Sequence, residues 1–221
     1  MGRVKKQKPK RRSVSSGVEA TNFVCWADAD YICARAMLLD GFLVQGAALS
    51  NTAIEKYLKA VRLIFGMGAN QSHNVAELYA SLKGKSVPPL NEGYLRTITK
   101  AYRLRYPDDL EPVFNVVLSQ WQLLAELDAS VFAIRKPFEI RRSDQREAVT
   151  QFDSWLKNSH HRLVDRNSAF SPYKRHALFE NPGSWYEVRV LSNGHIMEAH
   201  YSAVVADDGS FEAEALVPKP A

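Results

Sequence analysis

Two consecutive stretches with helical periodicity, joined by a glycine, constrain the fold of this chain more than any other feature. Between residues 27 and 66, apolar residues recur three and four positions apart on both sides of Gly41. The first stretch predicts a helix from about Trp26 to Phe42, and the second predicts another that ends near Phe65. Because glycine permits a sharp change of direction after a helix, the sequence predicts a helical hairpin at the start of a bundle.

The second of these helices separates apolar residues from charged ones. Its predicted buried stripe consists of Ile54, Tyr57, Leu58, Val61, Ile64 and Phe65. Four charged residues fall outside this stripe and are expected to face solvent, namely Glu55, Lys56, Lys59 and Arg62. Glu55 and Lys59 are four positions apart, a spacing that favours an ion pair on a helix.

Further helices are expected downstream. Ser72 is a suitable N-cap for a short helix that ends before Gly84, and Asn91 or Glu92 opens a helix that runs to about Arg103. Pro107 ends that region, and a long apolar pattern then predicts a helix over residues 110–134. Another helix is expected over residues 144–158 with Ser143 as its cap, and residues 166–184 are interpreted as a loop or linker.

The C-terminal part of the chain changes to an alternating pattern. Strands are predicted over residues 185–192 and 195–203, because they flank Asn193-Gly194, a sequence typical of a two-residue type I′ hairpin turn. That turn would place Val190 opposite Met197 and Arg189 opposite Glu198. A third strand over residues 211–217 would complete a small antiparallel meander.

The positive charge is concentrated at the N-terminus. The net charge is +5, but seven lysines and arginines lie within the first 12 residues, which leaves 22 basic and 24 acidic residues in the rest of the chain. A basic arm of this kind can bind phosphates, act as a localisation signal or increase solubility. Its candidate phosphate-binding residues are Lys5, Lys6, Arg11 and Arg12.

The sequence favours a cytoplasmic protein without a cofactor or a metal. No apolar run approaches the roughly 18 residues of a membrane span, so no membrane association is expected. Cys25 and Cys33 lie eight positions apart on or beside the same predicted helix, too far for a disulfide, and are expected to pack in the core. No P-loop, dinucleotide-binding glycine motif, serine-nucleophile motif or zinc-ligand spacing is present.

The order of these elements resembles that of the HEPN domain, a helical bundle often found beside nucleotidyltransferases. The resemblance covers residues 23–135. It depends on Gly41 with the alanine-rich start of the second helix, on Glu55-Lys56 followed by Leu58-Lys59-Ala60, on Ser72-His73-Asn74, and on Arg105-Tyr106-Pro107-Asp108. The fold class that it implies is mainly α, an antiparallel HEPN-like bundle with a small C-terminal antiparallel meander.

This reading divides the chain into four parts. Residues 1–20 are expected to form a disordered basic tail, residues 21–136 the HEPN-like bundle, residues 137–184 an extra helix with a linker, and residues 185–221 the hairpin or meander. We expect the meander to pack on the bundle or on a partner.

Many HEPN proteins are metal-independent ribonucleases in which an arginine precedes a histidine with four to six residues between them. Only Arg189 and His195 have that spacing here, and the predicted hairpin places them on opposite faces of the sheet. The resemblance therefore implies a protein without the usual catalytic pair in its bundle. If catalysis exists, the candidate residues are His73, which can transfer a proton, and Arg105, which can neutralise phosphate charge.

The candidate residues for binding RNA or a nucleotide are the lysines and arginines of two predicted helices, namely Lys56, Lys59, Lys100, Arg103 and Arg105. Solvated helix faces and local capping are the alternative explanation for these residues and for His73.

Three functions remain open. The first is a homodimeric HEPN protein that associates with RNA or a nucleotidyltransferase-type partner without catalysis. The second is a ribonuclease toxin of a toxin–antitoxin pair, and the third is a dimeric structural adaptor.

Overall fold

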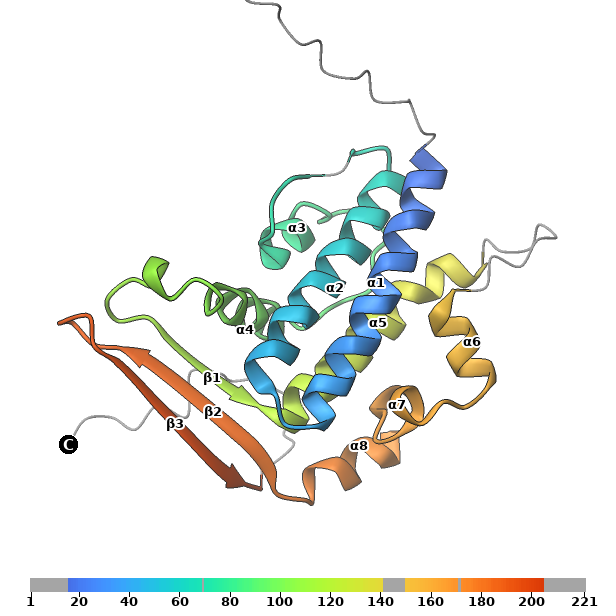
Figure 1. Cartoon of the computed structure of the whole chain (residues 1–221). Helices are drawn as coiled ribbons and strands as arrows, with labels where there is room; N and C mark the ends of the chain where they lie inside the picture. The colour runs from blue at the N-terminus through green and yellow to red at the C-terminus, as the bar shows by residue number, and fades with distance from the viewer. Residues whose placement is uncertain (1–15, 69, 141–149, 171, 205–221) are drawn as a thin grey trace, which may run out of the picture.

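A computed structural model describes residues 16–68, 70–140, 150–170 and 172–204 of the chain (Figure 1). Helices form most of this structure, and a three-stranded antiparallel sheet lies along one side of them (Figure 1). The fold class predicted from the sequence, mainly α with a small antiparallel sheet, is confirmed. The basic residues Lys5, Lys6, Arg11 and Arg12 lie outside the described residues.

The predicted helical hairpin is present. α1 spans Ser16–Leu39 and α2 spans Leu43–Ile64, so α1 includes residues 16–20, which the sequence had assigned to the tail. Gly41 has a φ of +83°, and its N–H donates to the carbonyl of Leu38 while the next N–H donates to that of Met37. This pair of bonds satisfies the last carbonyls of α1 and reverses the chain.

Two shorter helices follow the hairpin. α3 spans Val75–Ala80, and its N-cap is Asn74, whose side chain accepts from two backbone N–H groups, rather than the predicted Ser72. α4 spans Glu92–Arg103 with Asn91 as its N-cap, as predicted. Both helices contact α2.

The predicted helix over residues 110–134 is wrong in its first half. A short 3₁₀ turn, η1 (Pro107–Asp109), is followed by β1 (Asn115–Ser119), and α5 (Gln120–Ile140) begins only after that strand. Val113, expected inside the helix, is 80% exposed and has a φ of +66°. Val116 and Val117 favour an extended chain because they are β-branched, and the strand is nearly buried on both faces.

The segment after α5 is more helical than the sequence suggested. α6 (Gln151–Lys157) is capped by Thr150 in a capping box with Asp153, whereas the predicted cap, Ser143, lies outside the described residues. α7 (His161–Val164), η2 (Ser168–Phe170) and α8 (Pro172–Phe179) follow. The prediction of a loop over residues 166–184 is therefore wrong.

β2 (Gly183–Val190) and β3 (Ile196–Ala203) form the predicted hairpin, but with a register one residue away from the predicted one. Arg189 pairs with Met197, and Val190 with Ile196. The Gly194 N–H donates to the carbonyl of Leu191, and Gly194 has a φ of +80°. This is a three-residue turn with a glycine bulge rather than a two-residue turn, and the extra residue moves every β3 side chain to the other face.

The third strand of the sheet comes from the middle of the chain. β1 pairs with β2 in the strand order β1-β2-β3, whereas the predicted third strand, residues 211–217, lies outside the described residues. Gln120, just after β1, donates to the carbonyls of Leu38 (2.7 Å) and Leu39 (3.2 Å) and accepts from the Ser184 N–H (3.0 Å). The sheet is therefore joined to the end of α1 by one buried amide.

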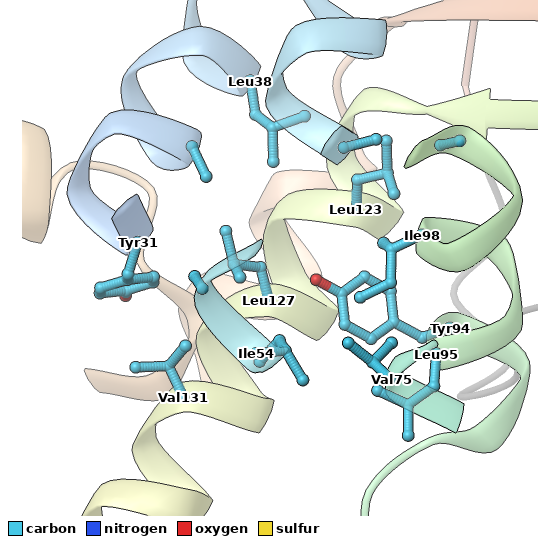
Figure 2. Close-up of a cluster of buried hydrophobic side chains, with 14 of the residues drawn as sticks. Tyr31, Leu38, Ile54, Val75, Tyr94, Leu95, Ile98, Leu123, Leu127 and Val131 are labelled. Carbon is cyan, nitrogen blue, oxygen red and sulfur yellow. The ribbon is translucent and has the colours of Figure 1, made fainter. Parts of the chain in front are cut away.

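The hydrophobic core lies between α1, α2, α4 and α5 (Figure 2). Tyr31 and Leu38 enter it from α1, Ile54 from α2, and Tyr94 from α4 (Figure 2). Most of the stripe predicted for α2 is buried, although Phe65 remains 36% exposed. The prediction that both cysteines pack in the core is wrong for Cys33, which is exposed.

Two ion pairs cross the core between α1 and α5. Asp28 on α1 pairs with Arg135 on α5, and Arg35 on α1 pairs with Asp128 on α5. All four side chains are at most 2% exposed. On each helix the aspartate precedes the arginine by seven residues, which is about two helical turns, so both charges lie on one face and meet their opposites on the other helix.

A tyrosine completes each ion pair. Tyr31 donates to the Asp128 carboxylate (2.8 Å), and Tyr57 donates to that of Asp28. Burial, followed by the adjacent aspartate, raises the pKa of each of these tyrosines well above its ordinary value. Burial also raises the pKa of both aspartates, because desolvation penalises the charged carboxylate more than its partners stabilise it.

Removing one member of a buried pair should destabilise the fold strongly. We expect Arg135→Met to lower the free energy of unfolding by about 3–5 kcal/mol, because Asp28 is left buried without its cation. Arg96→Met is the matched control: Arg96 also pairs with a carboxylate, that of Glu92, but both side chains are more than 60% exposed, so its effect should stay below about 1 kcal/mol. Urea unfolding measures both; equal losses would contradict the assignment.

The buried tyrosines also predict instability at alkaline pH. Above pH 10 they ionise in the unfolded chain, whereas their raised pKa keeps them protonated in the folded chain. The unfolded state then binds fewer protons, so stability falls as pH rises, by about 1.4 kcal/mol per pH unit for each tyrosine. Urea unfolding between pH 9 and 11 measures how the free energy of unfolding depends on pH. This free energy should fall less steeply with pH for Tyr57→Phe than for Tyr106→Phe, since Tyr106 is half exposed.

Candidate functional site

The charged residues of α2 are largely buried, which corrects the prediction of a solvated face. Glu55, Lys59 and Arg62 are 6%, 7% and 9% exposed. Arg62 donates to the hydroxyl of Ser81 and to the carbonyl of Gly68 (3.3 Å), so it fastens the α2–α3 connection. These side chains are covered because α3, α4 and the loop before α3 pack on this side of α2.

Lys56 and Lys59 both have acidic partners. Lys56 Nζ lies 2.5 Å from a carboxylate oxygen of Asp30 on α1. Lys59 Nζ lies 2.6 Å from Glu55 Oε1, which confirms the predicted ion pair. Neither lysine therefore carries an uncompensated charge toward solvent.

Glu55 also holds the candidate histidine. Its second oxygen, Oε2, lies 3.0 Å from Nδ1 of His73, and the His73 side chain is 64% exposed. The buried Asn51 side chain donates to the His73 carbonyl (3.1 Å), so the backbone there is fixed as well. With Nδ1 directed to the carboxylate, the other ring nitrogen, Nε2, is left for a ligand in solvent.

The second candidate, Arg105, meets His73 through one aromatic ring. The His73 ring stacks on Tyr102, with centroids 6.0 Å apart and planes 17° apart. The Arg105 guanidinium lies 4.8 Å from the Tyr102 centroid and 5.5 Å from that of Tyr106. We refer to Glu55, Lys59, His73, Tyr102 and Arg105 as the Tyr102 cluster.

The Tyr102 cluster combines three chemical functions. An imidazole with one nitrogen held by a carboxylate can accept or donate a proton at the other. A guanidinium can bind a phosphate through paired hydrogen bonds. The exposed His73 ring and the half-buried Tyr102 ring can stack on a nucleobase. These functions stand on α2, on α4 and the turn that follows it, and on the loop before α3, which Asn51 and Arg62 bind to α2.

The remaining predicted binding residues lie close by on α4. Lys100 is half-buried. Arg103 donates to the carbonyl of Asp109 (3.0 Å) and to the carboxylate of Glu111 (3.0 Å), and its guanidinium packs over Phe114. Arg103 is therefore engaged in fastening the turn that leads into β1, whereas the exposed Arg105 guanidinium packs on the rings of Tyr102 and Tyr106.

The one arginine–histidine pair with ribonuclease-like spacing belongs to the sheet. The observed register pairs Arg189 with Met197, and His195 accepts from the Leu191 N–H in the hairpin turn. By that register Arg189 and His195 share a side of the sheet, so the prediction that they lie on opposite faces is wrong. Arg189 lies 3.9 Å from Glu187 and is not part of the Tyr102 cluster.

Sequence reasoning missed Tyr102, which joins the two candidates. A tyrosine in the last turn of an amphipathic helix carries no distinctive signal; only its position three residues before Arg105 places both on neighbouring parts of the surface. The buried aspartates and arginines of α1 and α5 were missed too. Their signal was visible as Asp-Ala followed by arginine at the seventh position, once from Asp28 and once from Asp128.

Comparisons with known proteins add no assignment. No protein-family model matches the chain, and no curated protein or solved structure matches it. The resemblance to HEPN domains thus stays a prediction. Among the described residues, no three histidines, cysteines or acidic residues are placed to hold a metal ion, and no described helix has the length and apolar character needed to cross a membrane.

Loss of Glu55 and loss of Lys59 should differ in their cost to stability. We expect Glu55→Gln to destabilise the fold by about 3 kcal/mol, because Lys59 is left buried with a charge. Lys59→Met should destabilise the fold less, because the Glu55 carboxylate still has the exposed His73 imidazole as a partner. Chemical denaturation of the two variants measures the difference, and an equal or reversed order would contradict this arrangement.

Proposed function

We propose that this protein binds single-stranded RNA, and that the Tyr102 cluster is the part of the folded body that contacts it. The observation that carries the proposal is the packing of exposed His73 and exposed Arg105 on one half-buried tyrosine ring. Aromatic rings and arginine planes are the groups on which unstacked bases stack, and a guanidinium also binds the phosphates between them.

The N-terminal arm supports the same function from the sequence. Seven basic residues precede residue 13, and α1 begins at Ser16 at the end of the bundle that carries the loop before α3 (Figure 1). Lysines and arginines that neutralise phosphates release counterions, so their contribution falls as salt rises. The arm would add salt-sensitive affinity, and the cluster would add stacking that is less sensitive to salt.

RNA binding is tested by fluorescence anisotropy of a labelled single-stranded RNA with the full chain at low and moderate salt. We expect Tyr102→Ala and Arg105→Ala each to weaken binding about tenfold, as one lost stacking contact does. Arg96→Ala is the control, since Arg96 is an exposed arginine on α4, the helix that carries Tyr102, and lies outside the cluster. If all three variants bind like the unchanged chain, the cluster is not the site.

A metal-independent ribonuclease is the second candidate, and the Glu55–His73 contact is the observation that favours it. The carboxylate would orient the imidazole so that Nε2 removes the proton from a ribose 2′-hydroxyl. The 2′-oxygen would then form a bond to the adjacent phosphorus while the bond to the 5′-oxygen breaks, and that leaving oxygen would take a proton from water. Arg105 would neutralise charge on the attacked phosphate. A denaturing gel of the RNA from the binding experiment separates the two functions. Shortened RNA that becomes intact with His73→Ala supports the enzyme; intact RNA with the unchanged chain supports binding alone.

The roles of a toxin, of a nucleotidyltransferase partner and of a structural adaptor depend on the HEPN resemblance or on the sheet alone. Growth arrest on expression, relieved by His73→Ala, is the result expected of a ribonuclease toxin. Harmless expression together with RNA binding is the result expected of the non-catalytic protein that we favour.

A further inference from the structure

Among the described residues, β3 is the outermost strand of the sheet, and no other described strand pairs with its outer edge (Figure 1). In an antiparallel sheet the N–H and C=O of one residue point to the same side, and the next residue points to the other. Val190 exchanges hydrogen bonds with the β1 side, and the Leu191 N–H donates to His195 on the β3 side. The register therefore directs residues 197, 199 and 201 toward β2 and the backbone of Ile196, Glu198, His200 and Ser202 outward.

Within the described part of the chain, the edge of β3 carries no lysine, no proline and no covering element. Natural edge strands carry lysine or proline, or are short, bulged or covered. β3 has eight residues, none of them lysine or proline, and it exposes Ile196, Met197 and Tyr201 by 45%, 57% and 41%. A strand of this kind favours a partner strand.

We propose that β3 pairs with β3 of a second copy of this chain, antiparallel, about a two-fold axis that passes between the two Ala199 residues. The two sheets would join into one continuous sheet across the dimer. Such an interface is isologous, so it closes after two copies and leaves no free edge on the β3 side.

The register follows from the backbone. Outward-facing residues must lie opposite outward-facing residues, because directly opposed residues share their hydrogen-bonding type. Few symmetric registers meet this condition and also keep most residues of the two β3 strands opposite each other. Centring on Glu198 puts two like charges opposite each other, and centring on His200 leaves Glu198 opposite Ser202.

Centring on Ala199 matches the side chains on both faces. On one face Glu198 lies opposite His200 of the partner copy, twice by symmetry, which pairs an anion with a donor or cation. On the other face Met197 lies opposite Tyr201 of the partner copy, and sulfur–aromatic contacts are favourable. Within each copy Tyr201 already stacks on Trp185 (5.9 Å, 7°), and the His200 ring contacts Tyr186 in a tilted arrangement (4.6 Å, 44°), so these side chains are positioned before association.

Sedimentation of the full chain over a range of concentrations tests the dimer. We expect a monomer–dimer equilibrium, and we expect His200→Glu to raise its Kd about tenfold, because two like-charged pairs form across the axis. Adding Glu198→Lys to that variant should restore the dimer, because lysine then faces glutamate. Lys157→Glu on α6 is the control and should leave the Kd unchanged. A chain that stays monomeric, or a double variant without rescue, overturns the proposal.

Disulfide trapping tests the register independently of affinity. In a chain with Cys25 and Cys33 changed to Ser, Ala199→Cys should give a covalent dimer under mild oxidation, because the two Cβ atoms face each other across the axis at about 5 Å. Met197→Cys changes a residue on the same face, but position 197 of one copy lies opposite position 201 of the other. The two introduced cysteines would be too far apart to bond, so this variant should remain monomeric. Equal trapping of both, or of neither, overturns the register.

Discussion

The two reciprocal ion pairs between α1 and α5 are the constraint on which the rest of the structure depends. An isolated charge cannot be buried in an apolar core at an acceptable free energy, so each of the four residues needs its partner at one position of the opposite helix. The two pairs together fix both the antiparallel direction and the axial register of α1 against α5. A slip of one residue would separate both aspartates from both arginines.

The same arginines also organise the segment after α5. Arg35 donates to the carbonyls of Arg162 (3.0 Å) and Asp165 (2.6 Å), and Arg135 reaches Asp153 in the cap of α6 (3.1 Å). An apolar pair of the same size would hold the two helices together, but it would supply no hydrogen bonds to those loops. The charged groups thus connect α1, α5 and the segment after α5. Leucines at these positions would pack with less desolvation, but they could not make these hydrogen bonds.

The sequence predicted the parts of the fold in which local signals agree with tertiary packing. Gly41 marks the reversal between α1 and α2, and Asn91 marks the start of α4. It failed where one pattern serves two structures: a run such as Val116-Val117-Leu118 suits a buried strand as well as a helix, and Asn193-Gly194 suits two turns that differ by one residue. The pairing of β1 with β2 joins residues some 70 positions apart, and no local pattern predicts it.

The candidate site is hard to predict from the sequence because the sequence does not show which acidic residue pairs with each lysine or arginine in the fold. Lys56 and Lys59 read as a basic stripe along α2, yet Asp30 and Glu55 neutralise them, and one of these partners comes from another helix. His73 and Arg105 are 32 positions apart and meet on a tyrosine that carries no signal of its own. Charge counted along the chain overstates the binding surface, because folding uses most of these side chains to hold elements together. The exposed groups that are not used in this way, His73 Nε2 and the Arg105 guanidinium, are therefore the ones that a ligand could contact.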